Sequence, residues 1–398
     1  MDIFDKCKNF TIADTLIEQG IYPYFHALES RQDTEVVMEG KKEIMLGSNN
    51  YLGLTINEEV IEAGKNAILK YGSGCSGSRF LNGTTKLHLA LEKELAEFLN
   101  KEDCVTFSTG FQTNLGIISA IAGRSDYIIG DKENHASIYD GCRLSYAKLL
   151  RYNHSDMEDL ERQLKSIPLD AGKIIVTDGV FSMGGDICNL PKIVELAKKY
   201  NSRVMVDDAH AFGVIGEGGR GTASHFGLEK EVDIIMGTFS KSLASLGGYM
   251  VASHEVCNYV RHNSRPFIFA ASITPASVEC ARAALRVLKK EPERVTRLQE
   301  IAKYARKCFR EKGVNIRESK DEIIPIIPIN TYENEVTFIA CKKLFENGVY
   351  VNSSVSPAVP VGEAIIRTSY MATLTNEQID RATDIIAKVM GELNLLKK

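Results

Sequence analysis

The sequence lacks the features of a secreted, membrane-spanning or nucleic-acid-binding protein. No unbroken apolar run approaches the ~18 residues that a membrane-spanning helix requires. The first residues mix acidic with apolar side chains and lack the basic stretch, apolar core and cleavage site of a signal peptide. Lys and Arg together number 48 against 52 for Asp and Glu, and the formal net charge of −4 leaves no basic excess to bind a phosphate backbone. We therefore expect no nucleic-acid partner.

The sequence also lacks closely spaced cysteine pairs and contains few prolines. The 9 cysteines are scattered without any Cys-x-x-Cys pair, so the sequence encodes neither a zinc knuckle nor a redox dithiol, and we expect no metal site. An odd number of unpaired cysteines is typical of a reducing compartment, which predicts a cytoplasmic protein. The 10 prolines are few for 398 residues, since proline usually makes up about 5% of a chain. This scarcity favours continuous packed secondary structure.

The remaining composition, 44% hydrophobic and 25% charged, is that of a globular protein long enough for more than one domain. From about residue 57 to residue 285, helical patterns alternate with short β-branched runs, which predicts an α/β fold. Continuous apolar runs of this kind are typical of buried strands in a mostly parallel sheet. The predicted strands are 104–108, 127–130, 149–152, 173–177, 203–207, 234–237 and 248–251.

The pattern differs at the two ends of the chain. The start reads as a helical segment and a short strand-like stretch near 35–45. After residue 285 the pattern gives a long charged helix at 291–313, an apolar run at 323–329, a helix at 336–346, a strand with turns and a terminal helix from about 376. We therefore expect an N-terminal segment (1–56), a large α/β domain (57–285) and a small C-terminal α+β domain (286–398).

One glycine-rich motif points to nicotinamide binding but lies in the wrong context. The stretch from Gly72 to Gly77 matches the G-x-G-x-x-G pattern of dinucleotide-binding proteins. That fingerprint requires a strand before it and a helix directly after it. Here residues 58–71 are predicted as a helix and residues 78–85 as a loop. An NAD-dependent dehydrogenase remains a remote alternative, and a loop lining some other active site fits better.

Polar residues follow several of the predicted strands, at the sheet edge where open α/β folds bind their ligands. Asp207 and His210 follow one strand, and this pattern is also compatible with a helix cap or with half of a metal site. Lys241 follows the next strand between small hydroxyl residues, and burial lowers the pKa of an amine toward a nucleophilic state. Gly110 and His135 follow two earlier strands. The combination favours catalysis at this edge.

The chain resembles the fold-type-I pyridoxal-phosphate enzymes and, within them, the α-oxoamine synthases. The stretches that carry this resemblance occur in family order across nearly the whole chain; they are 49–54, 77–84, 134–137, 178–183, 207–213, 218–221, 238–241 and 366–369. The resemblance implies the fold of aspartate aminotransferase, with a large, mostly parallel sheet domain and a smaller α+β C-terminal domain. It also implies pyridoxal 5'-phosphate (PLP) as cofactor.

The resemblance assigns the residues around the cofactor ring. Lys241 would bind the cofactor covalently through an imine and later act as the base for the substrate α-proton. Asp207 would face the pyridine nitrogen and keep it protonated. His210 and Ser182 would hydrogen-bond the ring hydroxyl, and His135 would stack on the ring face. Lys241, His135, Asp207 and His210 are thus the expected catalytic residues.

The resemblance also assigns a phosphate site and a carboxylate site. The residues expected at the phosphate are Gly110, Phe111, Thr238 and Ser240, with a helix N-terminus to favour the anion. In this family the partner subunit contributes further phosphate contacts, and either Ser272 or Thr274 would do so here. Arg367 would bind the amino-acid carboxylate with its planar fork, assisted by Asn50.

The sequence around the lysine, residues 238–248, resembles the serine palmitoyltransferases. The implied reaction is a decarboxylating condensation of L-serine with a long-chain, palmitoyl-CoA-like thioester to 3-ketosphinganine, CoA and CO2, the first step of sphingolipid synthesis. Such enzymes are homodimers with shared active sites, and an amphiphilic product would make peripheral membrane contact useful. Phe111 and Leu374 depart from that subgroup, so glycine C-acetyltransferase and 8-amino-7-oxononanoate synthase remain alternatives. Free thiols at Cys75 and Cys188 are expected near the cofactor.

Overall fold

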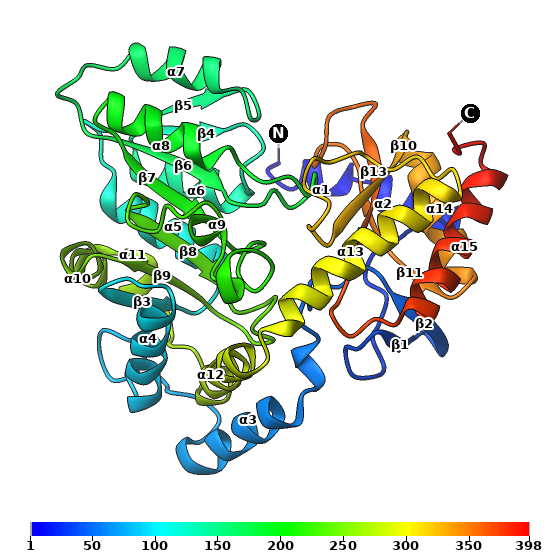
Figure 1. The fold of residues 1–398 in the computed structure, drawn as a ribbon, viewed down its shortest axis with the longest axis horizontal. Coiled ribbons are helices and arrows are strands. Elements are labelled where there is room, and N and C mark those ends of the chain that lie inside the picture. Colours follow the sequence, from blue (N-terminus) through cyan, green and yellow to red (C-terminus); the bar gives the residue numbers. More distant parts are fainter. Residues whose placement is uncertain (1, 398) are drawn as a thin grey trace.

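The computed structural model describes residues 2–397, and its larger lobe is built on a seven-stranded sheet (Figure 1). The strand order is β3-β9-β8-β7-β6-β4-β5. Strand β9 runs antiparallel to both of its neighbours, and every other neighbouring pair is parallel. The strands are β3 (Asp103–Phe107), β4 (Tyr127–Asp131), β5 (Lys148–Tyr152), β6 (Lys173–Asp178), β7 (Arg203–Asp207), β8 (Ile234–Thr238) and β9 (Gly248–Ala252). All seven predicted strands and the α/β class are confirmed.

Helices cover both faces of this sheet because its side chains alternate. On β7, Val204 and Val206 join the core shared with α4, α7, α8 and α12, whereas Met205 joins the core shared with α5, α6, α10 and α11. Both faces are therefore apolar, as in parallel sheets generally. The helices of this lobe are α3 (Glu58–Tyr71), α4 (Lys86–Phe98), α5 (Gly110–Ile121), α6 (Ala136–Ser145), α7 (Met157–Lys165), α8 (Leu190–Lys199), α9 (Thr222–His225), α10 (His254–Asn263), α11 (Arg265–Ile268) and α12 (Pro275–Lys290).

The smaller lobe has its own core and two three-stranded sheets. One has the order β1-β2-β11 and the other the order β10-β13-β12. Helix α13 leads into this lobe from α12 (Figure 1). Its elements are β1 (Glu35–Met38), β2 (Lys41–Met45), α13 (Glu293–Glu311), β10 (Ile326–Tyr332), α14 (Asn334–Glu346), β11 (Val349–Tyr350), β12 (Asn352–Ser354), β13 (Ala364–Ser369) and α15 (Asn376–Glu392).

The structure gives further detail for two segments of the smaller lobe. The single strand-like stretch near 35–45 is a pair of antiparallel strands, because Glu39 and Gly40 adopt positive φ angles and turn the chain. Within the apolar run 323–329, the strand β10 begins at Ile326. Strand β10 lies at a sheet edge, where Pro328 is tolerated although it has no N–H to donate.

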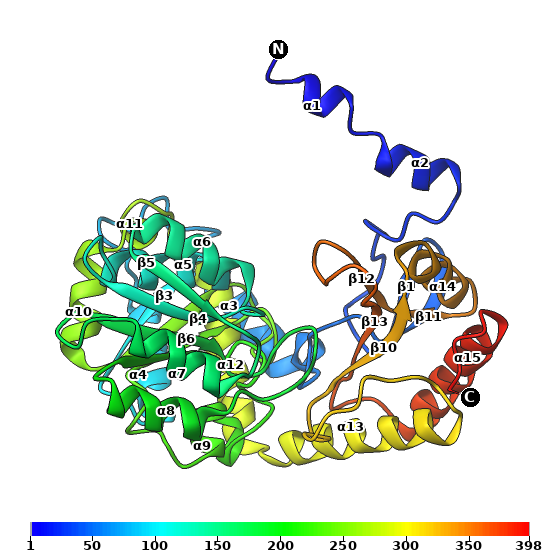
Figure 2. The ribbon, with the colours of Figure 1, turned by 90° about the horizontal axis from the view of Figure 1, so that it is seen from above.

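The first residues form an arm that projects from the body of the molecule (Figure 2). Its helices α1 (Asp5–Lys8) and α2 (Ile12–Glu18) contain no buried residue. A short 3-10 turn, η1 (Leu54–Ile56), follows further along and enters the large lobe. Across residues 2–397, no helix is both long enough and apolar enough to cross a membrane.

Candidate active site

The carboxyl ends of the central strands open into a cavity of about 260 Å³. The eight predicted site residues that line it are Gly110, Phe111, His135, Asp207, His210, Thr238, Ser240 and Lys241. They come from four different strand ends, as expected for a ligand site in an open α/β sheet. The structure therefore brings the predicted ring and phosphate residues together. A larger cavity of about 1000 Å³ lies at the opposite edge of the sheet, away from these residues.

Lys241 lies in the turn after β8, and this turn packs on the turn after β7. Ser242 Oγ donates to the carbonyl oxygen of Phe212 at 2.7 Å. Gly213, at φ +74°, leaves room for this contact, because a Cβ there would lie 2.6 Å from Ser242 Cβ. Burial lowers the pKa of Lys241 to about 8; Asp207 opposes this shift and the Arg367 charge adds to it. The amine is therefore unprotonated in an appreciable fraction of molecules near neutral pH.

We expect Lys241 of the cofactor-free protein to react with an aldehyde at unusually low pH. A lysine with an ordinary pKa of about 10.4 is almost fully protonated at pH 8. Because burial lowers the pKa of Lys241 to about 8, its reductive alkylation should reach half of the maximal rate near that pH. Mass spectrometry of the Lys241 peptide after borohydride reduction across pH 6–11 measures this midpoint. A rise only above pH 10 would contradict the prediction.

A hydrogen-bonded chain fixes the predicted ring residues Asp207 and His135. Asn114 Nδ2 donates to Asp207 Oδ2 at 2.7 Å and to Ser137 Oγ at 2.9 Å. Ser137 Oγ in turn bonds His135 Nδ1 at 2.7 Å, and the Ser137 backbone N–H donates to the same nitrogen at 3.2 Å. Asp207 Oδ1 accepts from the N–H of Ala209 at 2.9 Å. Asn114 and Ser137 line the cavity and were missed from the sequence.

His210 lies deep in the site and pairs with Tyr51 of the N-terminal segment. The Tyr51 hydroxyl and His210 Nδ1 share a hydrogen bond of 2.7 Å. Burial lowers the pKa of His210 well below its usual value, and the positive charges of Lys241 and Arg367 add to the effect. The imidazole is therefore neutral. Tyr51 was missed as a site residue, although it belongs to the 49–54 stretch that carries the resemblance.

Asp178 is a second missed acid, placed by the sheet register directly beside Asp207. It lines the cavity and accepts a long hydrogen bond of 3.4 Å from the backbone N–H of His135. Burial and the neighbouring Asp207 charge raise its pKa well above the ordinary range. Two adjacent buried charges repel each other, which favours the protonated form of Asp178.

The other end of the cavity has the features of a phosphate site. Thr109 caps helix α5 by accepting from the N–H of Gln112, so the first-turn N–H groups at Gly110 and Phe111 have no helical acceptor. A Cβ at Gly110 would lie 2.8 Å from Thr238 Oγ1, so only glycine lets the helix start approach that hydroxyl. Thr238 Oγ1 and Ser240 Oγ are 2.9 Å apart. Free N–H groups and paired hydroxyls fit an anionic phosphate.

Arg367 on β13 approaches the site from the small lobe, outside the residues that line the cavity. Its Nε donates to the backbone oxygen of Ser182 at 2.5 Å, and Nη1 donates to Ser369 Oγ at 2.6 Å. Nη2 is buried and has no partner. An unpaired buried guanidinium nitrogen is costly, and a carboxylate ligand would satisfy it. Ser182 lies outside the cavity lining too, and it meets Arg367 through its carbonyl.

The side chain of Asn50 makes two local hydrogen bonds. Its side-chain amide donates to Thr55 Oγ1 at 2.7 Å, and its side-chain oxygen accepts from the N–H of Leu54 at 3.1 Å. Both ends of the Asn50 amide thus hold the turn that enters η1, and its assistance to Arg367 at the substrate carboxylate stays a prediction.

The candidates for the partner subunit, Ser272 and Thr274, lie next to the glycine loop. Ser272 Oγ donates to the carbonyl oxygen of Gly77 at 3.0 Å. Thr274 is exposed and caps α12 by accepting from the N–H of Ser277. Neither residue lines the cavity of its own chain. The glycine loop lies between helices α3 and α4, which confirms that it has no dinucleotide-binding context.

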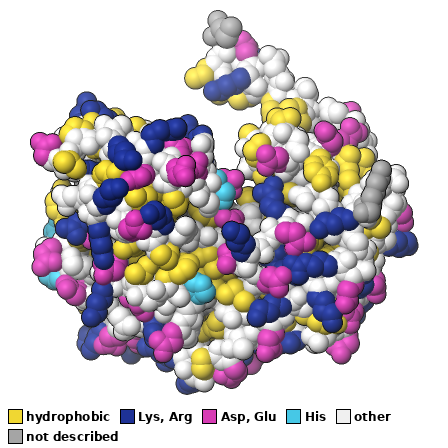
Figure 3. All heavy atoms as spheres, turned by 45° about the horizontal axis from the view of Figure 1, so that its top comes forward, with side chains coloured by type: hydrophobic (Ala, Val, Ile, Leu, Met, Phe, Trp, Pro, Cys, Tyr) yellow, Lys and Arg dark blue, Asp and Glu magenta, His cyan; other side chains and the backbone are white. Residues whose placement is uncertain are grey.

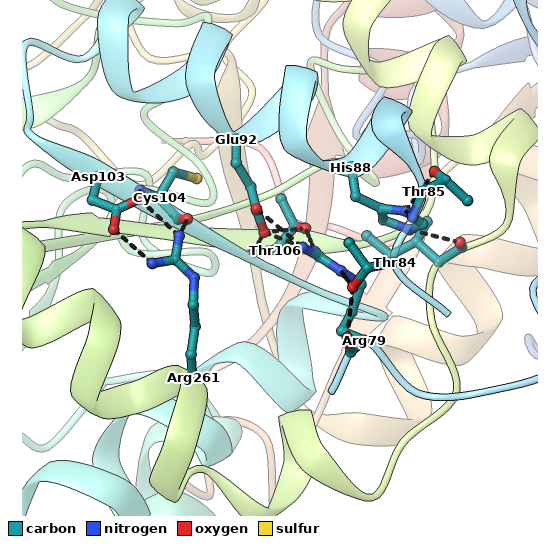
Figure 4. A network of polar contacts seen from close by, with 10 residues as sticks. Arg79, Thr84, Thr85, His88, Glu92, Asp103, Cys104, Thr106 and Arg261 are labelled. Carbon is teal, nitrogen blue, oxygen red and sulfur yellow. Dashed lines mark hydrogen bonds and ion pairs between the residues drawn. The ribbon is translucent and has the colours of Figure 1, made fainter. Parts of the chain in front are cut away.

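A buried polar network fixes the far end of that loop (Figure 4). Arg79 Nη1 and Nη2 form a two-pronged ion pair with Glu92 on α4 at 2.7 and 3.0 Å. Arg79 Nη1 also donates to Thr106 Oγ1 on β3 at 2.7 Å. The nearby pair of Arg261 and Asp103 ties α10 to the same strand. This loop is therefore held on the large lobe rather than being a free surface turn.

The remaining candidates carry no chemistry of their own. All nine cysteines are unpaired. Cys188 is buried, which raises its pKa well above the usual value, and neither Cys75 nor Cys188 lines the cavity. Within residues 2–397, no group of His, Cys, Asp and Glu side chains could hold a metal ion.

Positive and negative side chains are intermingled on the face of the molecule that Figure 3 shows, and the surface is hollowed between the two lobes.

Comparison with known proteins agrees with this geometry. Residues 41–386 match the family described as aminotransferase class I and II. The serine palmitoyltransferase of Sphingobacterium spiritivorum is 49% identical over 391 residues, covering 98% of this chain and 97% of the relative. The 8-amino-7-oxononanoate synthase of Lysinibacillus sphaericus is 42% identical over 379 residues, covering 95% and 97%.

Solved structures give the same result. The serine palmitoyltransferase of Sphingomonas wittichii superposes with a TM-score of 0.96 at 36% identity, with 100% of both chains covered. A lysine-to-alanine variant of the S. paucimobilis serine palmitoyltransferase, which carries a bound PLP–myriocin aldimine, superposes with a TM-score of 0.96 at 35% identity and the same coverage. The predicted fold of a large, mostly parallel sheet domain with a smaller α+β part is confirmed.

Proposed function

Since the chain belongs to the aminotransferase class I and II family, and within it to the α-oxoamine synthases, we propose that it condenses L-serine with a long-chain acyl-CoA. The products are 3-ketosphinganine, CoA and CO2, and the cofactor is PLP. One observation carries the choice of substrate: serine palmitoyltransferases from two genera are 49% and 50% identical over 98% of this chain, against 42% for an 8-amino-7-oxononanoate synthase.

The residues of the cavity fit PLP. The cofactor, when bound, supplies an electron-withdrawing ring that stabilises negative charge at the α-carbon of the amino acid. Lys241 would hold it covalently, and Asp207 would keep a proton on the ring nitrogen, since Asn114 and Ala209 already fix both carboxylate oxygens. The start of α5 would bind the phosphate, with the hydroxyl groups of Thr238 and Ser240.

The protein's own groups then perform two tasks on L-serine and one at the cofactor ring. Arg367 binds the carboxylate through the buried Nη2 that lacks a partner. Lys241 Nζ, whose pKa burial lowers to about 8, removes the α-proton. His135, held by Ser137, would cover one face of the ring and keep water from it. His210 and Ser182 remain the proposed contacts of the ring hydroxyl.

We also propose that the active enzyme is a homodimer with shared active sites. Ser272 and Thr274 do not line the cavity of their own chain, so they are available to the phosphate of a second subunit. Apolar side chains at the surface near the glycine loop and the cavity support this: Phe80, Leu81, Phe111 and Leu246 are all exposed. The division into 1–56, 57–285 and 286–398 likewise remains a proposal.

A substrate ladder tests the function. We expect turnover with L-serine and acyl-CoA thioesters of about 14–18 carbons, and far slower turnover with glycine or L-alanine. Release of CoA thiol, measured with each amino acid against acetyl-, pimeloyl-, octanoyl- and palmitoyl-CoA, gives the comparison. The visible spectrum of the bound cofactor should change when L-serine is added without any acyl-CoA. Turnover of alanine with pimeloyl-CoA but not of serine with palmitoyl-CoA would instead identify an 8-amino-7-oxononanoate synthase.

A further inference from the structure

The chain after β6 makes a tight turn, residues 181–186, at which the two lobes meet. The N–H of Gly185 donates to the carbonyl oxygen of Phe181 at 2.9 Å, and the N–H of Phe181 donates to that of Asp186 at 3.0 Å. Arg367, from the small lobe, donates its Nε to the carbonyl oxygen of Ser182 at 2.5 Å. The position of this turn therefore sets one of the two hydrogen bonds that orient the Arg367 guanidinium.

His154 holds the 181–186 turn from the side of the large lobe. Its Nε2 bonds Asp186 Oδ2 at 3.0 Å, and its Nδ1 bonds Asp131 Oδ1 at 2.9 Å. The ring also meets the Phe181 ring edge-on, with centroids 4.5 Å apart. Both ends of the turn are thus in contact with one side chain that no catalytic task requires.

The charge of His154 suits this bridging position. Burial alone would lower its pKa, but the hydrogen bonds to Asp131 and Asp186 outweigh burial and raise the pKa to about 10. Both ring nitrogens carry protons in the charged form, so each can donate to one carboxylate. Glu133 is the third acid nearby, with Oε2 3.8 Å from Nε2, which is beyond hydrogen-bonding distance.

Asp131 gives the bridge a fixed end. It is 1% exposed and terminates β4. Its Oδ1 accepts from the N–H of Glu133, and its Oδ2 accepts from the N–H of Ser155, each at 2.9 Å. Asp131 therefore cannot move without breaking backbone contacts of the sheet edge. Asp186 lies at the end of a turn, so His154 transmits the rigidity of the sheet to that turn.

We propose that His154 is a positioning residue that orients Arg367 toward the carboxylate of the amino-acid substrate, through Asp186 and the carbonyl group of Ser182. The inference rests on the proposed function of Arg367 as carboxylate ligand. It assigns His154 to substrate binding rather than to proton transfer, because its hydrogen-bond partners, Asp131 and Asp186, do not line the cavity. Loss of the bridge therefore affects the amino acid and spares the thioester.

The test compares His154→Asn with Glu133→Gln in the PLP-loaded enzyme. Asparagine reaches one carboxylate at most, and it leaves Asp131 and Asp186 facing each other without a cation. We expect the KM for L-serine to rise about tenfold while kcat changes less than about threefold, because a ligand misplaced by a fraction of an ångström loses affinity first. The KM for palmitoyl-CoA should stay constant, as should all constants of Glu133→Gln.

Binding of L-serine alone gives a second readout, from the change in the visible spectrum of the bound cofactor. The dissociation constant should rise about tenfold in His154→Asn, matching the change in KM. Asp186→Asn should reproduce the effect, and the double variant should be no worse than either single one, because both remove the same bridge. Asp186→Asn also tests the inference if His154→Asn does not fold.

Two results would overturn the proposal. One is an unchanged KM for L-serine in folded His154→Asn or Asp186→Asn. The other is an equal loss of affinity for serine and palmitoyl-CoA together with loss of cofactor, which a general structural role would produce. If the wild-type enzyme does not use L-serine, the proposed function itself is contradicted. The wild-type assay shows this independently of the variants.

Discussion

Replacing Lys241 by alanine is expected to lower the turnover of L-serine and palmitoyl-CoA by roughly 10⁴-fold or more. Lys241 lines the cavity together with Asp207, and burial lowers the pKa of its amine to about 8. No other lysine lines the cavity, so no second amine can hold the cofactor or remove the α-proton there. The measurement is CoA release under single-turnover and steady-state conditions at saturating substrates.

The fate of the cofactor separates a chemical loss from a folding defect. Borohydride treatment of the wild-type enzyme should attach the cofactor permanently to the peptide containing Lys241, and Lys241→Ala should show no such attachment. Removal of a buried amine with a lowered pKa does not destabilise the fold, so the Tm of the cofactor-free variant should not fall. Lys230→Ala, at an exposed position, serves as the control. Reducible cofactor still bound covalently to Lys241→Ala would remove the central role of this residue.

The sequence was sufficient to predict the strands of the large lobe and the residues at their ends. Buried parallel strands are uninterrupted apolar runs, and such runs differ clearly from the amphipathic helices between them. The residues at their carboxyl ends, among them Asp207 and Lys241, are brought to one cavity by the topology alone. The proposed phosphate site was predicted in the same way, from the glycine that begins α5.

The site residues that the sequence analysis missed are held by partners that are distant in the sequence. Asn114 is inside helix α5, and its partner Asp207 is 93 residues further along the chain. The pairing of Tyr51 with His210 spans 159 residues. From sequence, a polar residue in a helix is expected to be exposed, and only the packing of α5 on the sheet shows that Asn114 faces Asp207. Asp178 was missed for a similar reason: it becomes a neighbour of Asp207 only through the pairing of strands β6 and β7.

The structure gives Asn50 a local role in addition to its predicted contact with the substrate carboxylate. Asparagine side chains hydrogen-bond nearby backbone groups and stabilise turns, and this use competes with ligand binding. In the structure both ends of the Asn50 amide are occupied within five residues of the chain. A motif shared with a family marks such a residue equally well for either role, so the sequence did not distinguish them.

Asp207→Asn is expected to lower kcat by roughly 10²-fold or more, because a neutral amide cannot keep a proton on the cofactor ring as a carboxylate does. Both carboxylate oxygens accept hydrogen bonds, from Asn114 Nδ2 at 2.7 Å and from the N–H of Ala209 at 2.9 Å. An asparagine must point its NH₂ group at one of these two donors. The variant should therefore also lose about 1–3 kcal/mol of stability through one unmade buried hydrogen bond.

Asp208→Asn is the matched control, one residue away and equally buried. Burial raises the pKa of Asp208 to about 7, so its carboxyl group is partly neutral already. Only Oδ2 accepts a backbone hydrogen bond, from Thr222 at 3.0 Å, and Oδ1 has no partner, so an amide fits without facing a donor. We expect near wild-type kcat and Tm for Asp208→Asn. Equal losses of kcat in the two variants would mean that buried charge at the end of β7, rather than contact with the cofactor, explains the need for Asp207.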